Sequence, residues 1–243
     1  VGLLNQAANF LVQTTALFTL AIAVVAIFNV GARQLLVRPG HQLVLNGGLD
    51  LADIHLGAAL HLLANDFCDG GAVICVIDSR AAAGTMVLLI RRAQALMEAA
   101  GDDGDFDALC QQLHRYQATL RTCFTLENFD NLIKNGRMRP IVGTLLRSLG
   151  IHIIADATAE GTIHVADKAR GVGKTYRAIT ALMKASKDCT DAEVVISHCE
   201  NLEGAMALKR QILADLPVKQ VDLLSCRGLT SFYAMEKGLI VGY

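Results

Sequence analysis

Residues 128–151 read NFDNLIKNGRMRPIVGTLLRSLGI, and the interpretation of the whole chain depends on this stretch. Its pattern predicts a short amphipathic helix ending at Asn135-Gly136, then Arg137, and then a second apolar helix that runs to Gly150. A guanidinium presents a planar fork of donors, so an arginine between helix ends and beside apolar side chains suits an anionic head group. The stretch therefore predicts a polar site at the edge of an apolar core.

The composition of the chain narrows the classes of protein to which it can belong. Its 243 residues are enough for one large or two modest domains. Charge is nearly balanced, with 22 Lys and Arg against 23 Asp and Glu, which argues against a general nucleic-acid binder. Hydrophobic residues make up 53% and charged residues only 19%. Such a composition indicates a deep core, a lipid pocket, a large interface or a membrane segment.

The chain has seven cysteines and seven histidines, and neither set has the spacing of a known metal site. The number of cysteines is odd and no pair forms a CxxC motif, so we expect buried free thiols in a reducing cytoplasm. No HExxH pattern or similar histidine spacing occurs. We therefore expect no metal and no cofactor.

The apolar run Phe10–Val30 contains no charged residue, and two interpretations of it stay open. It is long enough to span a bilayer, which would make the chain a membrane-anchored interaction protein. Alternatively, it divides into a helix over 9–19 and a strand over 20–27 that is buried on both faces of a sheet.

The rest of the chain alternates between helical and strand patterns. Helices are expected at 53–67, 84–100, 106–119, 175–187 and 202–216, with Asp105 as the N-cap of the third and Asn201 as the N-cap of the last. Strands are expected at 42–45, 72–77, 122–126, 194–197, 221–224 and 239–242. Residues 151–155 and 162–166 read as a hairpin around Glu160-Gly161. This alternation predicts an α/β fold with mostly parallel sheets and helices on both faces. We place a boundary between an N-terminal domain, 1–125, and a C-terminal domain, 126–243.

The loop Gly171–Thr175 follows a predicted strand and opens a predicted helix, as a phosphate-binding loop does. The full GxxxxGK[ST] pattern requires a glycine at position 168, where the chain has Lys168. A nucleotide-binding protein that uses this loop is therefore an alternative function, and a solvated basic turn at a helix start is the competing interpretation.

Asp78-Ser79-Arg80 follows a buried strand and precedes a helix. Ligands of open α/β sheets sit beyond the carboxyl ends of the strands, so Ser79 is placed to donate to an anion. Capping of the following helix by Asp78 or Ser79 is the alternative.

From about Val73 to Tyr243 the chain resembles the DegV family. No single segment is decisive, but the order and spacing of the segments together are fairly specific. The matching segments are Val76–Arg80 (VIDSR), Leu126–Arg137, Gly143–Ile154, Lys168–Gly171 (KARG), Arg227–Tyr233 and Gly238–Tyr243.

The resemblance implies a two-domain α/β fold with one long-chain fatty acid bound between the domains. It also implies a protein without catalysis of its own, which presents the acid's carboxylate to a separate fatty acid kinase for acyl phosphate formation in phospholipid metabolism. We accordingly expect a cytoplasmic protein with the fatty acid as its ligand and no nucleic-acid partner. Any membrane contact is expected to be transient.

Positions in the family's motifs supply most of the candidate site residues. Arg137, with Gly136, would belong to the head-group network, and Tyr233 falls where many members have a histidine near the head. Ser79, at its strand end, completes the predicted lipid-binding set. Lys168 and Arg170 are the predicted partner-binding residues, with Arg170 facing the kinase.

The chain departs from the family's pattern in its first 70 residues. Family members open with a strand ending in DS, where this chain has only Ala26-Ile27-Phe28-Asn29. A TSQP-like segment is missing, and Ile54-His55-Leu56 stands where SGT is expected. Those two motifs supply head-group hydroxyls in the family. The N-terminal domain is therefore predicted to be divergent or shortened.

Overall fold

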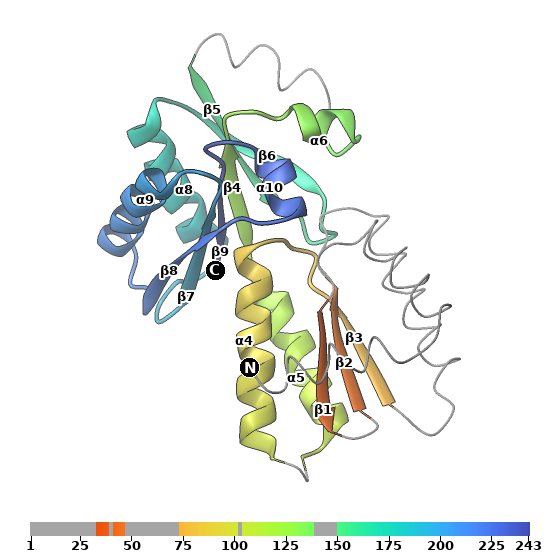
Figure 1. Ribbon diagram of the computed structural model, residues 1–243. Helices are drawn as coiled ribbons and strands as arrows, with labels where there is room; N and C mark the ends of the chain where they lie inside the picture. The colour runs from red at the N-terminus through yellow and green to blue at the C-terminus, as the bar shows by residue number, and fades with distance from the viewer. Residues whose placement is uncertain (1–32, 39–40, 47–72, 102–103, 139–149) are drawn as a thin grey trace.

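The computed structural model describes residues 33–38, 41–46, 73–101, 104–138 and 150–243 (Figure 1). They form one sheet of three strands and one of six, with helices packed against both. The predicted α/β class is therefore confirmed. The predictions for residues 1–32 and 53–67, and for the second apolar helix of the opening stretch, fall outside the described residues.

The three-stranded sheet consists of β1 (Arg33–Arg38), β2 (His41–Asn46) and β3 (Val73–Asp78), in that order. β1 pairs with β2 antiparallel, and β2 pairs with β3 parallel. Two helices follow in the chain, α4 (Gly84–Ala100) and α5 (Phe106–Thr119). They pack against each other, and α5 also contacts β3 (Figure 1).

Local sequence signals account for the two helices. α4 has the predicted bounds, and its leucines Leu88 and Leu89 are buried. α5 begins where the Asp105 carboxylate accepts hydrogen bonds from the backbone N–H groups of Asp107 and Ala108. The predicted N-cap is therefore confirmed, and the helix start follows from satisfying otherwise unpaired donors.

The six-stranded sheet has the order β6-β5-β4-β9-β7-β8. Its strands are β4 (Thr122–Leu126), β5 (Ile151–Ala157), β6 (Ile163–Arg170), β7 (Glu193–His198), β8 (Gln220–Ser225) and β9 (Leu239–Gly242). The hairpin of β5 and β6 confirms the prediction around Glu160-Gly161.

The prediction of mostly parallel sheets is wrong. In the six-stranded sheet only β7 and β8 pair parallel, while the other neighbouring strands pair antiparallel. The turn between β5 and β6 is too short for the crossover that a parallel pair requires. β9 adds two further antiparallel pairs, because it returns at the end of the chain and inserts between β4 and β7.

One face of the six-stranded sheet is covered by α8 (Val172–Ser186) and α9 (Leu202–Asp215), and we call it the α8/α9 face (Figure 1). α8 begins three residues earlier than the sequence predicts. Asn201 caps α9 as predicted, accepting a hydrogen bond from the Gly204 N–H. The buried side chains of this face form one cluster that includes Ile179, Met183, Leu208, Ile212, Val194 and Ile196.

The opposite face carries the short helices α6 (Asp130–Lys134) and α10 (Leu229–Ala234), and we call it the α6/α10 face. The N-terminal part of α4 covers the end of this face formed by β7 and β9. Helices therefore lie on both faces of the sheet, as predicted. The largest members of the apolar cluster under α6 and α10 are Phe124, Leu126, Phe129, Leu132, Met138, Ile153 and Ile240.

Two glycines allow α4 to approach the sheet closely. A Cβ atom on Gly84 would lie 2.4 Å from the Val195 carbonyl oxygen, and one on Gly242 would lie 2.3 Å from the Thr85 backbone nitrogen. Beside them, the hydroxyls of Thr85 and Thr122 are 2.7 Å apart and share a hydrogen bond. The helix is thereby held against the sheet by close contact and by a buried polar pair.

The predicted domain boundary between residues 125 and 126 falls inside β4, which pairs with β5 and β9 of the six-stranded sheet. The division into two domains stays a proposal. Sheet membership favours placing the boundary before Thr122. α4 then belongs to the first domain and contacts β7 and β9 of the second.

Candidate functional site

The turn after α6 is built by Gly136. Its φ angle is +72°, a left-handed conformation that glycine adopts without strain. The Gly136 N–H donates to the Ile133 carbonyl, and the Arg137 N–H donates to the Leu132 carbonyl. These two hydrogen bonds form a Schellman motif, which ends the helix and turns the chain sharply. The local sequence Asn135-Gly136 thus fixes where Arg137 leaves the helix.

Arg137 lies over the aromatic ring of Tyr233, with 5.0 Å between the guanidinium carbon and the ring centroid. This distance is within the range of a cation–π contact. Tyr233 belongs to α10, and the Asn131 side-chain amide of α6 donates to the Phe232 carbonyl at 2.7 Å. That hydrogen bond links the two short helices. Two predicted lipid-binding residues, 96 positions apart in the chain, are therefore in contact.

The Arg137–Tyr233 pair borders the apolar cluster of the α6/α10 face. Tyr233 itself packs against that cluster and is only half-buried. Met138, the residue after Arg137, is a buried member of the same cluster. A guanidinium and a phenol hydroxyl thus occur at the rim of a buried cluster of large apolar side chains. Such a combination can hold an acidic head while an aliphatic tail lies on the apolar side chains.

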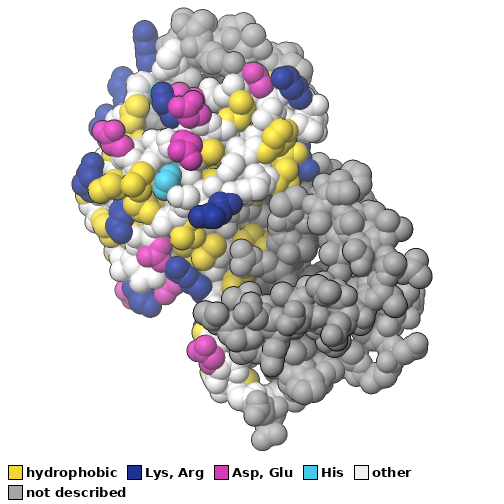
Figure 2. Space-filling view, viewed as in Figure 1, with side chains coloured by type: hydrophobic (Ala, Val, Ile, Leu, Met, Phe, Trp, Pro, Cys, Tyr) yellow, Lys and Arg dark blue, Asp and Glu magenta, His cyan; other side chains and the backbone are white. Residues whose placement is uncertain are grey.

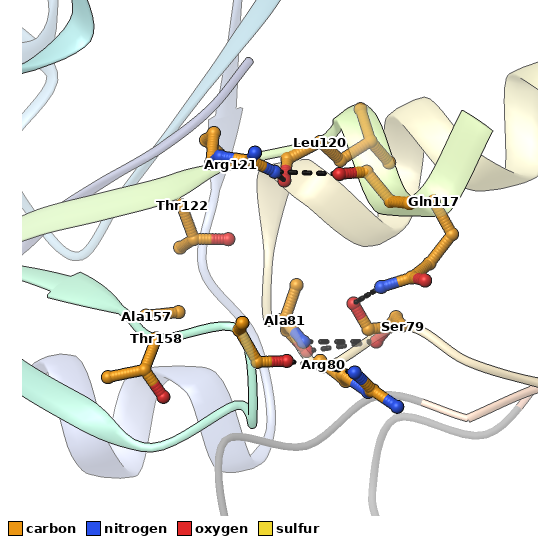
Figure 3. A pocket seen from close by; sticks show the side chains of 11 residues that line it. Ser79, Arg80, Ala81, Gln117, Leu120, Arg121, Thr122, Ala157 and Thr158 are labelled. Atoms are coloured by element: carbon orange, nitrogen blue, oxygen red, sulfur yellow. Dashed lines mark hydrogen bonds between the residues drawn. The ribbon is translucent and has the colours of Figure 1, made fainter. Parts of the chain in front are cut away.

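Ser79 lies in a different place from the other three predicted lipid-binding residues. Its side chain is 3% exposed and lines a polar cavity of about 260 Å³ (Figure 3). Arg121, Gln117 and Thr122 also line this cavity, whereas Arg137, Gly136 and Tyr233 do not. The structure therefore brings Arg137, Gly136 and Tyr233 together, and Ser79 as a lipid contact stays a prediction.

The donors around Ser79 are engaged in local structure. The Ser79 hydroxyl donates to the Ala81 carbonyl at 3.2 Å, and its oxygen accepts from the Ala81 N–H at 3.3 Å. The Gln117 side-chain amide donates to the Ser79 carbonyl at 3.2 Å. Arg121 Nη1 donates to the carbonyls of Ala118 and Leu120, near the end of α5. These contacts stabilise the loop after β3 and the end of α5.

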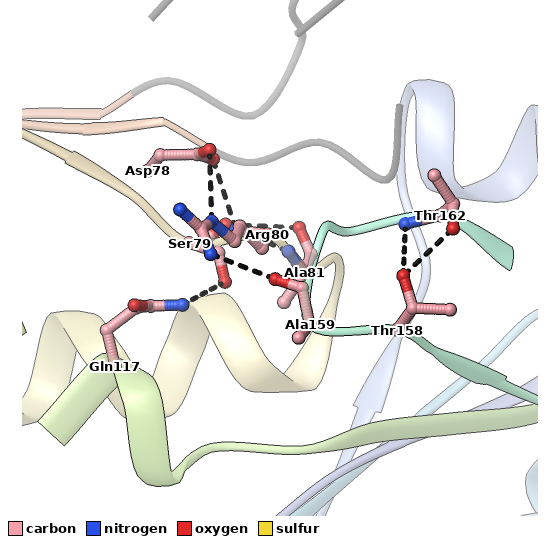
Figure 4. A network of polar contacts seen from close by, with 8 residues as sticks. All are labelled: Asp78, Ser79, Arg80, Ala81, Gln117, Thr158, Ala159 and Thr162. Atoms are coloured by element: carbon pink, nitrogen blue, oxygen red, sulfur yellow. Dashed lines mark hydrogen bonds and ion pairs between the residues drawn. The ribbon is translucent and has the colours of Figure 1, made fainter. Parts of the chain in front are cut away.

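Arg80 connects the loop after β3 with the β5–β6 hairpin (Figure 4). Its Nη1 donates to the Ala159 carbonyl at 2.9 Å. The Arg80 backbone N–H donates to Asp78 Oδ1, and the Arg80 Nε lies 3.8 Å from Asp78 Oδ2. Burial raises the pKa of the Asp78 carboxyl, and the hydrogen bond and the guanidinium oppose that shift. The sequence contains no spacing signal for the Arg80–Ala159 contact, because it joins residues 79 positions apart.

The predicted partner-binding residues Lys168 and Arg170 are exposed on β6, the edge strand of the six-stranded sheet. Being two residues apart in a strand, they point to the same face. Ala169, between them, packs on the α8/α9 side. Lys168 and Arg170 therefore project on the α6/α10 side of the sheet, which also carries Arg137.

The Gly171–Thr175 segment does not form a loop around a phosphate. Gly171 alone separates the end of β6 from the start of α8, so successive backbone N–H groups have no loop in which to surround an anion. The Thr175 hydroxyl donates to the Gly171 carbonyl at 3.1 Å. The geometry favours the basic-turn interpretation over the nucleotide alternative.

Neither a metal-binding cluster nor a membrane-spanning helix occurs among the residues that the structure describes. They contain no group of three His, Cys, Asp or Glu side chains arranged to hold a metal ion. No helix within them is long and apolar enough to cross a bilayer. On the face in Figure 2, basic and acidic side chains lie close to one another among the coloured residues.

Comparison with known proteins gives a consistent result for most of the chain. A family model described as an uncharacterised protein of the DegV family matches residues 58–238. A DegV domain-containing protein of Streptococcus gordonii is 32% identical over 171 residues, which cover 70% of this chain and 59% of that protein. This chain thus spans about three fifths of the length of the curated relatives it matches.

Solved structures extend the comparison to three dimensions. The Fatty Acid Kinase B3 protein of Streptococcus pneumoniae, loaded with linoleic acid, is 30% identical to this chain, and the two structures match with a TM-score of 0.68. The match covers 79% of this chain and 66% of the Streptococcus pneumoniae chain. A DegV family protein of Ruminococcus gnavus, refined with vaccenic acid, is 27% identical with a TM-score of 0.70, and the match covers 83% of this chain and 71% of that protein's chain. A DegV family protein of Eubacterium eligens, loaded with heptadecanoic acid, is 25% identical with a TM-score of 0.68, and the match covers 76% of this chain and 65% of that protein's chain.

Proposed function

The chain belongs to the DegV family, and from this membership we propose that it binds one long-chain fatty acid between its two domains. The acid is its ligand, and the protein carries out no chemistry of its own. The fatty-acid-bound structures of the similar proteins from Streptococcus pneumoniae, Ruminococcus gnavus and Eubacterium eligens support this function. The protein acts in the cytoplasm, with no nucleic-acid partner and with only transient membrane contact.

The observation that carries the proposal is the position of Arg137 over Tyr233 at the rim of the apolar cluster. In the proposed complex the Arg137 guanidinium pairs with the carboxylate of the acid, and the Tyr233 hydroxyl donates a hydrogen bond to it. Gly136 contributes through its left-handed turn, which aims Arg137 away from the end of α6.

The apolar side of the site supplies most of the proposed affinity. Each methylene removed from water contributes roughly 0.8 kcal/mol, so a chain of 16 to 18 carbons needs only an apolar surface and few polar contacts. On the α6/α10 face, Ile133, Ile163 and Val165 pack against the apolar cluster and are only partly buried, so they can contact the acyl chain. The head-group contacts then fix the orientation of the acid more than they determine its total affinity.

We also propose that the protein presents the carboxylate to a separate fatty acid kinase, which converts it to an acyl phosphate for phospholipid metabolism. Lys168 and Arg170 form the partner-binding edge, because both are exposed on β6 on the side of the sheet that carries Arg137. The name of the Streptococcus pneumoniae Fatty Acid Kinase B3 protein supports a kinase partner.

Native mass spectrometry and lipid extraction of the purified protein test the proposal directly. We expect a long-chain acyl ligand in the purified protein, and saturable binding of palmitate or oleate after delipidation. An empty protein without measurable affinity for either acid would overturn the proposal. In a thermal unfolding experiment on the same protein, ATP with magnesium should leave the melting temperature unchanged, because Gly171–Thr175 forms no phosphate loop.

Replacing the Arg137 guanidinium by an uncharged amide tests whether Arg137 binds the carboxylate of the fatty acid. Arg137→Gln should weaken palmitate binding, while Arg210→Gln, an exposed arginine on α9, serves as the matched control. The methyl ester of palmitate should bind both variants equally, since it lacks the charge that Arg137 pairs with. Equal loss of acid and ester binding in Arg137→Gln would indicate a packing defect and remove Arg137 from the head-group site.

A further inference from the structure

A polar cavity lies where the loop after β3, the end of α5 and the β5–β6 hairpin meet, and the proposed function does not use it (Figure 3). The three segments contribute Arg80, Gln117 and Thr158 in turn, and Arg121 lines the cavity between α5 and β4. Among the described residues that line it, Leu120 is the one large apolar side chain. The cavity therefore offers little surface to an acyl chain and suits a polar ligand.

Two guanidiniums line the cavity, and local contacts use only part of each. Arg80 Nη1 donates to the Ala159 carbonyl, and Arg121 Nη1 donates to the carbonyls of Ala118 and Leu120. Within the part of the chain that the structure describes, Nη2 of neither arginine donates a hydrogen bond. A guanidinium carries five N–H donors, so each arginine keeps donors with which it can bind an anion.

The charges around the cavity also favour an anion. None of the described residues that line it is Asp or Glu. The Asp78 carboxylate lies outside the lining, 3.8 Å from Arg80 Nε, and offsets part of the charge of that arginine. Arg121 forms no ion pair with a described carboxylate, and the Lys187 ammonium donates to the Thr119 carbonyl at 3.3 Å. The end of α5 therefore carries two positive charges beside the cavity.

The loop that carries Arg80 has a backbone conformation that is unusual for its residues. The φ angle is +48° at Arg80 and +53° at Ala83, in the left-handed region that residues other than glycine rarely adopt. Such conformations cost free energy and cluster at sites that hold ligands. α4 begins at Gly84 without a side-chain cap, three residues after Ala81, which lines the cavity. The positive end of the α4 dipole thus adds to the two guanidiniums.

We propose that this cavity is a binding site for a small phosphate, either inorganic phosphate or the phosphate group of a small ester. A tetrahedral anion has enough oxygens to accept hydrogen bonds from two guanidinium forks at once, here those of Arg80 and Arg121. The cavity volume of about 260 Å³ lies below the range of about 300–1,000 Å³ that is usual for drug-sized ligands, so a nucleotide is too large.

The phosphate site is separate from the proposed fatty-acid site. Arg137 and Tyr233 do not line the cavity, so this inference goes beyond the proposed function and does not depend on it. A phosphate held by both guanidiniums would connect the loop after β3 with the segment that leads into β4. Because this arrangement exists only in the folded chain, phosphate should stabilise the folded state.

Calorimetric titration of the full chain with sodium phosphate, at an ionic strength held constant with sodium chloride, is the first test. We expect saturable binding, and a melting temperature that rises with the phosphate concentration. Glycerol phosphate distinguishes the two sources of the anion: tighter binding of this ester assigns the site to a small phosphorylated molecule, and equal or weaker binding assigns it to the phosphate group alone. Failure of both compounds to bind saturably would overturn the proposal.

Variants test where the phosphate binds. Arg80→Gln and Arg121→Gln should each weaken phosphate binding by about tenfold, because each removes charge-assisted hydrogen bonds. Arg115→Gln, an exposed arginine of α5 outside the lining, is the matched control and should bind as the parent does.

Arg121 also donates to carbonyls of α5, so a variant that keeps this contact is needed as well. Ala118→Leu adds bulk to the lining without a change of charge and should abolish phosphate binding. Parent-like affinity in Arg80→Gln and Ala118→Leu would show that phosphate binds elsewhere. A loss in Arg115→Gln as large as that in Arg80→Gln would indicate an effect of net charge, and it would equally overturn the proposal.

Discussion

The two faces of the six-stranded sheet differ in how they are covered. α8 and α9, with 15 and 14 residues, cover one face with a continuous apolar cluster. The helices over the cluster on the other face, α6 and α10, have 5 and 6 residues, and this face carries Arg137 and Tyr233 at the rim of its cluster. Long amphipathic helices bury a face completely, whereas short ones end within it and place polar termini beside apolar side chains. The α8/α9 face is thus covered by a continuous buried core, whereas the α6/α10 face is the one on which we propose that the ligand binds.

Truncation of one isoleucine on each face should give the largest effects and test this division. Ile179→Ala, on α8, removes a fully buried side chain and should cost about 2–5 kcal/mol of unfolding free energy without changing palmitate affinity. Ile153→Ala, on β5, is the matched change on the α6/α10 face and should weaken palmitate binding as well. Denaturant unfolding and isothermal titration measure the two quantities. If both variants affected affinity equally, the two faces would not differ in role.

Loss of the guanidinium at the rim should have the next largest effect. Arg137→Gln removes a charge-assisted contact to the proposed carboxylate, and we expect a loss of about 1.5–3 kcal/mol of binding free energy. Its unfolding free energy should change little, because the side chain is only half-buried. Parallel measurements of affinity and stability distinguish this result from general destabilisation.

A methyl group added where α4 contacts β7 should lower the unfolding free energy. The expected loss is similar to, or smaller than, the loss of binding free energy in Arg137→Gln. Gly84→Ala places a Cβ atom against the Val195 carbonyl, so α4 must shift away from β7, at a cost of about 1–3 kcal/mol. Gly173→Ala, near the start of α8, has only the end of the Arg177 side chain nearby and serves as control. Equal melting temperatures for the two variants would contradict the close packing of α4.

The smallest expected effect is a change in pH dependence from Asp78. Burial holds its folded-state pKa above the unfolded value, so the folded protein binds more protons and gains stability as the pH falls toward the unfolded pKa. This contribution is lost as the pH rises through the folded pKa. Asp78→Asn should remove it, so the parent should gain stability relative to the variant as the pH falls toward the unfolded pKa of about 4. A pH-independent difference would show that burial does not govern this carboxyl.

The predictions from sequence were most accurate where a structure depends on residues near in the chain. The start of α5 at Asp105, the bounds of α4 and the hairpin of β5 and β6 follow from capping, periodicity and turn residues. The expected parallel pairing was wrong, because alternation of helices and strands does not reveal that β9 returns between β4 and β7. Strand order depends on contacts between distant residues, which leave no periodic signal in one sequence.

The features of the candidate site likewise divide into those that nearby residues determine and those that depend on distant residues. The sequence indicated Gly136 and Arg137 through a local turn signal, and resemblance to the family indicated Tyr233. The Asn131 amide that links α6 to α10, and the Arg80 guanidinium that reaches Ala159, were not foreseen. Both are single hydrogen bonds between distant segments, and many polar side chains could have formed them.

The amino-acid sequence alone determined the helices, the tight turns and the apolar character of the strands, because those depend on interactions within a few residues. Tertiary structure decided which strands are neighbours, which face received the short helices, and that Arg137 lies over Tyr233 while Ser79 lines another cavity. Packing couples residues that are far apart in the chain, and only the folded chain brings them within contact distance.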